Sequence, residues 1–307
     1  MRYSAEWHEI LFGKEVRRED ETTPREWGKK LNHKAVGRYC TKRVICGEYQ
    51  EWQVYPVWKW QRDATRAKKA RPTEAAQRMQ NAKNSRRRLV WLLNTNFTNE
   101  DIFNTLTYRD NPPQTVEEAR ADMQAYIRRV KRWRQKNELP EMRYIYTIET
   151  VRDGRKTRVH HHIVMSGMPR DVAESLWGKG RANASKLQPD EYGFEGLARY
   201  MIKTQGQRAH GERLWSASRN LTEPTVRYSY SRLSRAAIAT GAADEAELRA
   251  IIEHGQPGFF VNDITINHSD MVPGAYVTVR LRRIAPRGGP PNDRATTNRQ
   301  RPQRRKP

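Results

Sequence analysis

The stretch Arg158-Val159-His160-His161-His162-Ile163-Val164-Met165 organises the interpretation of the whole chain. It predicts a β-strand, and the side chains of a strand alternate between two faces. His160 and His162 therefore point one way, and His161 points the other. Two imidazoles at this spacing on a rigid strand can hold one metal ion. A chance cluster, or a set of hydrogen-bonded structural histidines, is the competing interpretation that the flanking sequence must decide.

A carboxylate in the preceding segment could complete such a site. Met142–Glu149 predicts a strand, and Asp153-Gly154 is a strong signal for a two-residue hairpin turn. With that turn, Glu149 pairs with Arg158 and lies diagonal to His160, at about 7–8 Å between backbones. Glu149 would then share a sheet face with both outward histidines, and a metal site formed by Glu149, His160 and His162 is expected. A three-residue turn would reverse the parity.

The flanking sequence predicts an α+β fold. Asp101–Tyr108 is typical of a strand, and Thr115 is a candidate N-cap for a long helix whose apolar stripe packs on the sheet. Pro72 suits the first turn of another helix. Further elements are predicted as a short edge strand over 54–58, helices over 171–177, 194–204 and 245–253, and strands over 259–266 and 276–281 that could close the sheet.

The composition indicates a nucleic-acid partner. The 307 residues include 58 Lys and Arg against 35 Asp and Glu, a net charge of +23. A partner with repeating negative charge explains this excess better than a membrane does, although a merely basic surface is the alternative. The chain has no long apolar run and no signal-peptide pattern at its beginning, so a soluble, cytoplasmic protein is expected. Cys40 and Cys46 indicate reduced thiols, with zinc bound together with His33 as the lesser alternative.

Basic side chains near the predicted sheet are candidates for contact with DNA phosphates. They lie at a helix end, around the predicted hairpin, in a glycine-containing loop and after a tryptophan-rich segment. The candidates are Arg86, Arg87, Arg88, Arg152, Lys156, Arg158, Lys179, Arg181 and Arg219. For the helix end a solvated surface is the alternative interpretation, and for the glycine-containing loop the alternative is a plain turn.

Three segments occur in an order that resembles a known family. They are Phe103–Tyr108, the pattern Arg158-x-His160-x-His162 with Glu149 upstream, and Tyr200-Met201-Ile202-Lys203. Over roughly residues 72–221 the chain resembles the HUH superfamily of single-strand endonucleases, and more closely the rolling-circle replication-associated (Rep) proteins of small phages and mobile elements. Two departures stand out: His161 occupies a position that is usually bulky and apolar, and Thr204 replaces the second tyrosine of some relatives.

The resemblance implies a central antiparallel sheet of the split βαβ (RRM-like) type with flanking helices. It also implies that Tyr200 is the only catalytic tyrosine, that Lys203 assists it, and that the metal is Mg²⁺ or Mn²⁺, with Zn²⁺ not separated by the ligands alone. The implied domains are an accessory segment over 1–70, an endonuclease domain over 71–284 and a disordered basic tail over 285–307.

The implied function is that of a rolling-circle replication initiator. Such a protein nicks and rejoins single-stranded origin DNA through a 5′-phosphotyrosyl intermediate and works with host replication proteins. A relaxase or transposase would use the same chemistry. A noncatalytic basic nucleic-acid-binding protein with incidental histidines is the hypothesis from a different class.

Overall fold

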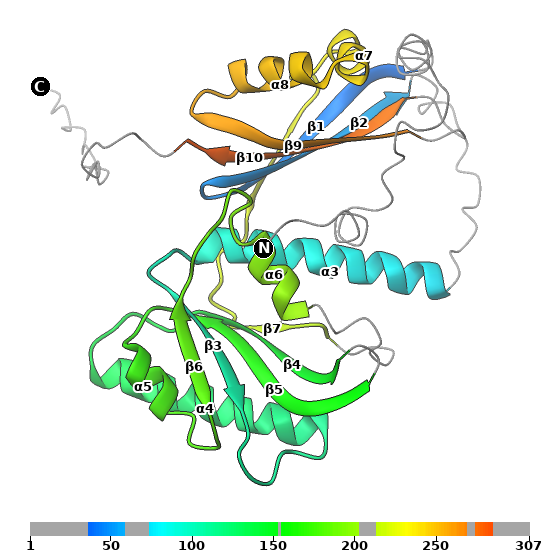
Figure 1. Ribbon diagram of the computed structural model, residues 1–307. Helices are drawn as coiled ribbons and strands as arrows, with labels where there is room; N and C mark the ends of the chain where they lie inside the picture. Colours follow the sequence, from blue (N-terminus) through cyan, green and yellow to red (C-terminus); the bar gives the residue numbers. More distant parts are fainter. Residues whose placement is uncertain (1–35, 59–73, 153–154, 203–212, 269–273, 285–307) are drawn as a thin grey trace, which may run out of the picture.

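The computed structural model describes residues 36–58, 74–152, 155–202, 213–268 and 274–284. The described part is α+β, as predicted, and it stacks two sheets and several helices in layers (Figure 1). The upper sheet of Figure 1 has the strand order β8-β1-β2-β10-β9, and the lower sheet has the order β6-β3-β5-β4-β7. Among the described residues, no helix combines the length and apolar character needed to cross a membrane.

The lower sheet contains the predicted histidine strand at its centre. Its strands are β6 Ala182–Lys186, β3 Ile102–Thr107, β5 Arg155–Met165, β4 Tyr144–Arg152 and β7 Ser216–Ala217. Every ladder in this sheet is antiparallel. The strands predicted before, within and after the histidine run are therefore confirmed.

One face of the lower sheet packs on α4 Val116–Lys136 and α5 Arg170–Ser175 (Figure 1). Thr115 caps α4 as predicted, because its side-chain oxygen accepts a hydrogen bond from the Glu118 backbone N–H. The predicted apolar stripe of α4 is buried throughout: Ala119, Met123, Tyr126, Ile127 and Val130. These residues meet Ile163 and Met165 of β5 in one core cluster.

The other face of the lower sheet is covered by α3 Glu74–Asn96 and α6 Glu195–Ile202, which lie between the two sheets (Figure 1). Val164 of β5 joins a second core cluster with Leu93 of α3 and Ala198 of α6. The same cluster includes Val44 from the upper sheet. α3 and α6 therefore pack against both sheets at once.

The upper sheet corrects two predictions. It consists of β8 Thr225–Ser229, β1 Val36–Cys46, β2 Tyr49–Trp58, β10 Ala275–Arg283 and β9 Phe259–His268, with α7 Arg235–Ala243 and α8 Glu245–His254 above it (Figure 1). β9 and β10 were expected to close the histidine sheet, and that expectation is wrong, because they pair with β2 instead. Alternation along a strand indicates a buried face but does not specify the partner strand.

The predicted edge strand over 54–58 is also wrong, since β2 lies between β1 and β10. Pro56 is tolerated there because the ladder with β10 runs only as far as the pair between Val277 and Val54. Beyond that pair, the missing N–H of the proline interrupts no bond to β10.

A buried ion pair connects the upper sheet to α6. The guanidinium of Arg280 on β10 lies 2.9 and 3.1 Å from the two carboxylate oxygens of Glu195, and both side chains are almost fully buried. A second nitrogen of Arg280 lies 2.9 Å from Asp263 on β9. Burial raises the pKa of Glu195, and the nearby Arg280 acts in the opposite direction. A bidentate pair of this kind stabilises the ionised carboxylate inside the protein.

Replacing Arg280 with Met is expected to lower the free energy of unfolding by about 3–5 kcal/mol, because Glu195 would keep a buried charge without its partner. Urea denaturation measures the change. Adding Glu195→Gln should recover part of the loss. The control is Lys186→Met, which removes an exposed ion pair with Glu100 and should cost less than about 1 kcal/mol. Equal effects of the Arg280 and Lys186 substitutions would contradict the structural role of Arg280.

Candidate metal centre and its surroundings

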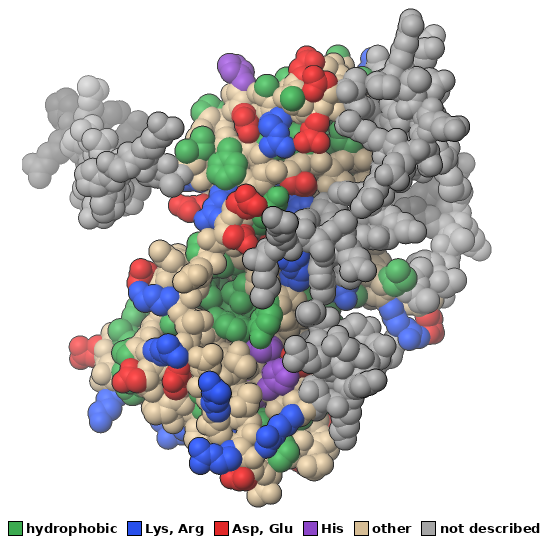
Figure 2. Space-filling model, in the orientation of Figure 1, with side chains coloured by type: hydrophobic (Ala, Val, Ile, Leu, Met, Phe, Trp, Pro, Cys, Tyr) green, Lys and Arg blue, Asp and Glu red, His purple; other side chains and the backbone are tan. Residues whose placement is uncertain are grey.

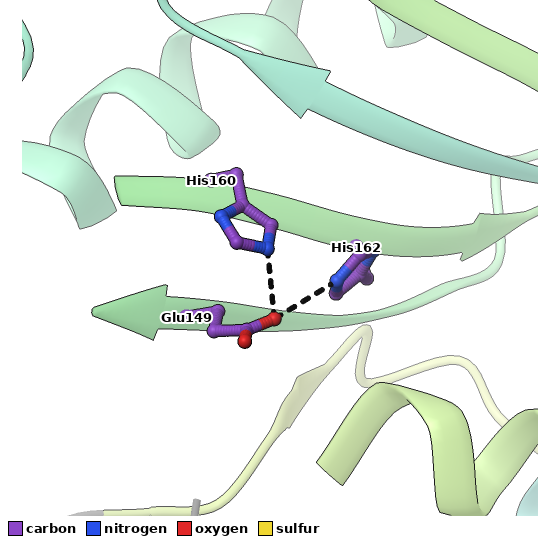
Figure 3. Close-up of side chains that lie close together, drawn as sticks. All are labelled: Glu149, His160 and His162. Carbon is purple, nitrogen blue, oxygen red and sulfur yellow. Dashed lines mark hydrogen bonds and ion pairs between the residues drawn. The ribbon is translucent and has the colours of Figure 1, made fainter. Parts of the chain in front are cut away.

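Glu149 of β4 and the two outward histidines of β5 converge on one point (Figure 3). The Nε2 atom of His160 lies 2.8 Å from Oε2 of Glu149, and the Nε2 atom of His162 lies 3.3 Å from the same oxygen. The three ligand atoms lie within 4.8 Å of one another. The structure therefore brings together the three residues that the sequence predicted as a possible metal site.

The strand register that produces this convergence differs from the prediction. Glu149 pairs directly with His160, not with Arg158. Nearer the turn, Val151 pairs with Lys156, so three residues of β5 stand opposite Thr150 alone. The irregularity shifts β5 by two residues. Because an even shift keeps every side chain on its own face, Glu149 still shares a face with both histidines.

The hydrogen bonds of the two imidazoles leave the inward nitrogens available as ligands. Nδ1 of His160 lies 2.9 Å from the backbone oxygen of Arg158. A carbonyl can only accept, so in the neutral ring this nitrogen carries the proton and Nε2 carries the lone pair. Nδ1 of His162 lies 3.2 Å from the hydroxyl of Thr105. Burial lowers the pKa of His162, with the hydrogen bond to Glu149 acting against it, and the neutral form binds metal.

The spacing of these atoms fits a shared cation. Two ligand atoms at right angles around one ion, each about 2.1 Å away, are separated by about 3.0 Å. The separations of 2.8 and 3.3 Å from Glu149 to the histidines bracket this value. Thr147, opposite His162, adds a buried hydroxyl without a hydrogen-bond partner in the described part of the chain. A cation here would relieve the approach of the Glu149 oxygen to the lone pair of His160.

Substitution of either outward histidine by alanine is expected to weaken Mn²⁺ binding at least about tenfold, because each removes one of three ligands. Isothermal titration calorimetry and the electron paramagnetic resonance signal of free Mn²⁺ measure the binding. His254→Ala is the control, since His254 is an exposed histidine at the end of α8. Unchanged Mn²⁺ affinity in His160→Ala and His162→Ala would refute the metal site.

His161 points into the opposite core, as predicted. It is fully buried, its Nε2 lies 2.8 Å from the hydroxyl of Tyr108, and its ring contacts Trp177. The Tyr108 hydroxyl donates in turn to Asp122, 3.1 Å away. Burial lowers the pKa of His161 to about 3, so the ring is neutral. His161 is therefore a structural residue of the core and not a third histidine ligand.

His161→Ala is expected to lower the free energy of unfolding by about 2–4 kcal/mol, because it leaves a cavity and removes the hydrogen bond to Tyr108. Metal binding by the folded protein should remain near that of the parent. Thermal denaturation and Mn²⁺ titration measure the two quantities. Loss of metal binding in a normally folded His161→Ala protein would show that the assignment of the two faces of β5 is wrong.

Tyr200 lies against the candidate metal centre. It is on α6, its side chain is 48% exposed, and its ring centroid is 5.0 Å from that of His162. Phe103 of β3 contacts both rings, stacking on His162 at 5.6 Å and meeting Tyr200 edge-on at 5.8 Å. Lys203, the predicted assistant of Tyr200, lies outside the described residues. The structure thus places the predicted nucleophile beside the predicted ligands.

The sequence motifs contained Phe103 and Thr105, but their roles emerge only from the structure. Both alternate residues of β3 project onto the metal-site face, where Phe103 stacks on the His162 ring and Thr105 contacts its Nδ1. The alternation of Phe103, Thr105 and Thr107 along β3 was the available signal. Which strand lies beside β5 could not be read from that alternation.

The candidate DNA-binding residues fall into different environments. Arg158, Lys179, Arg181 and Arg219 are exposed, and Figure 2 shows Lys and Arg side chains around the histidines that reach this surface. Arg158 donates to the backbone oxygen of Arg109, and Lys179 pairs with Asp122 at 2.6 Å. The side chains of Arg152 and Lys156 lie outside the described part of the structure.

The three arginines on α3 are less alike than their sequence suggests. Arg87 lies 3.1 Å from the buried Glu51 of β2, which makes it a structural contact between α3 and the upper sheet. Arg88 pairs with the exposed Glu223 at 2.6 Å. Arg86 is partly buried, and burial lowers its pKa.

The two cysteines show no sign of the alternative zinc site. Cys40 and Cys46 are buried free thiols on β1, as the interpretation as reduced thiols predicts. His33, the third residue of that alternative, lies outside the described residues.

Comparison with known proteins supports the predicted resemblance. Residues 101–205 match a family model described as Replication-associated protein of the ORF2 type. This range includes β3, the Glu149 and histidine strands and Tyr200. No curated protein and no solved structure matches the chain. The matched region is therefore of the replication-associated type, and it contains all three ligands of the candidate metal centre.

Proposed function

We propose that this protein is a metal-dependent nickase of the HUH type that initiates rolling-circle replication. The observation that carries the proposal is the position of Tyr200, whose ring contacts His162 within a cluster of two histidines and a carboxylate. The replication-associated family match over the same residues supports it. Single-stranded origin DNA would be the substrate.

Tyr200 would act as the nucleophile. A phenol with an ordinary pKa of about 10 attacks phosphorus only when the phosphate is activated and correctly placed. Its oxygen would form a bond to the scissile phosphorus while the bond from phosphorus to the 3′ oxygen breaks. The phenolic proton leaves to solvent, and the departing 3′ oxygen takes up a proton. The products are a 5′-phosphotyrosyl link and a free 3′-OH.

Glu149, His160 and His162 would hold a divalent cation, Mg²⁺ or Mn²⁺, with positions left for phosphate and water. When bound, the cation polarises the phosphate and offsets its charge. Phe103 packs against Tyr200 and His162 and would keep their rings in a fixed relation. Lys203 would stabilise negative charge near the tyrosine oxygen.

The products suit replication. A free 3′-OH can prime synthesis by host replication proteins, and the phosphotyrosyl bond retains the energy needed for rejoining. Attack of a 3′-OH on that bond restores the phosphodiester and the phenol without a nucleotide cofactor. Exposed Arg158, Arg181 and Arg219 are proposed contacts for the DNA backbone. A cytoplasmic location in the host cell is proposed for the same reason.

Tyr200→Phe is expected to abolish nicking of a single-stranded origin oligonucleotide and to leave binding within about twofold, because only the attacking oxygen is removed. Denaturing gels detect the nicked strand and the covalent protein–DNA adduct. Tyr144→Phe is the matched control, since Tyr144 packs on the α4 side of the lower sheet. EDTA should abolish activity of the parent protein. A covalent adduct formed by Tyr200→Phe, or nicking that survives EDTA, would overturn the proposal.

A further inference from the structure

The upper sheet exposes a group of tyrosines far along the chain from the candidate metal centre. Tyr228 on β8, Tyr230 just after it and Tyr276 on β10 are 59%, 50% and 41% exposed. Tyr55 on β2 is partly exposed. These four residues form what we call the tyrosine face. Large exposed rings grouped on one sheet surface commonly mark a binding site.

The strand pairing puts these rings on the same side of the sheet. Tyr228 pairs with Lys42 of β1, and Tyr55 pairs with Cys40, two residues earlier on the same strand. The hydrogen bond to the Cys40 thiol and burial raise the pKa of Tyr55, and Tyr228 and Tyr230 contribute in the same direction. Tyr276 precedes Val277, which pairs with Val54, so it lies beside Tyr55. The tyrosine face therefore runs across four neighbouring strands.

This side of the upper sheet is the one opposite α7 and α8. Nearer the β1–β2 turn it is buried under α3, where Val44, Cys46 and Tyr49 enter the core. Toward the other end of β1 and β2 the strands diverge from α3 (Figure 1). The tyrosine face lies on that diverging part, so no described helix covers it.

Cations accompany the exposed rings. The guanidinium of Arg38 lies over the ring of Tyr230, 4.3 Å from its centroid, and Lys42 stands next to Tyr228. The carboxylates that the described strands place on this side are Glu51 and Asp263. Each is paired, with Arg87 and Arg280 respectively. The tyrosine face is therefore aromatic and positively charged, with its nearest carboxylates neutralised.

We infer that the tyrosine face binds single-stranded DNA, with bases stacked on Tyr228, Tyr230 and Tyr276 and phosphates held by Arg38 and Lys42. Aromatic rings interleaved with cations suit unpaired bases, whose flat faces are accessible, whereas a duplex hides them. The charge complements a nucleic-acid strand and not a basic or neutral protein. The inference rests on the proposed function in one respect: the strand held here is taken to continue from the strand that is nicked.

The structure offers a physical reason for such a second contact. Arg280, on the same strand as Tyr276, pairs with Glu195 at the beginning of α6, which carries Tyr200. Residues of the tyrosine face and the proposed nucleophile are thus attached to elements joined by a buried ion pair. A strand held at both places would be fixed relative to Tyr200.

Fluorescence anisotropy with a labelled oligo(dT) strand in EDTA tests the inference without cleavage. Combined Tyr228→Ala and Tyr276→Ala substitutions in the full chain should weaken binding at least about tenfold at every salt concentration, with the salt dependence unchanged. Tyr228→Phe with Tyr276→Phe should restore binding, because the rings are kept. Arg38→Ala should instead reduce the salt dependence. Leu139→Ala, another exposed apolar residue, is the control.

Cross-linking to an oligonucleotide that contains 5-iododeoxyuridine should map to the tyrosines of this face. Unchanged oligo(dT) affinity in the double alanine variant would overturn the inference. Unchanged affinity with a lower melting temperature would show that another part of the protein, or a second copy, covers the face, and would overturn it as well. Because these measurements need no metal and no Tyr200 hydroxyl, they can fail while nicking is observed, or succeed while nicking is absent.

Discussion

The hydrogen bond between His161 and Tyr108 fixes the face of β5 on which the other two histidines lie. His161 is enclosed in the core between the lower sheet and α4 and α5, where Trp177 packs on its ring. Alternation along the strand then leaves His160 and His162 no choice but the opposite face. The polar site therefore depends on an interaction in the core behind it, and the unusual middle histidine is part of that core.

A second constraint joins this site to the rest of the chain. α6 carries Tyr200 on one side, while its first residue, Glu195, pairs with Arg280 in the upper sheet. α3 adds the pair between Arg87 and Glu51. Two ion pairs and one shared apolar cluster hold the helices between the sheets. The position of the proposed nucleophile is therefore set by both sheets and not by the histidine sheet alone.

Local features were predicted well because their causes are local. The Thr115 cap, the apolar stripe of α4 and the alternation of β5 each depend on residues a few positions apart. The candidate site followed from the same alternation, with Glu149 placed on the correct face by a wrong register. That result survived because the irregularity in β5 moved the pairing by two residues, which preserves the face.

By itself, the sequence determined which segments are strands and helices around the histidines, which two histidines share a face, and the order of the three motifs. Only the tertiary structure decided that β1, β2, β9 and β10 form a separate sheet, that Glu149 pairs with His160, and that Tyr200 contacts His162. Periodicity records whether a side chain is buried, since that depends on its own face. It carries no record of the partner strand, because pairing between distant segments is settled by packing of the whole chain.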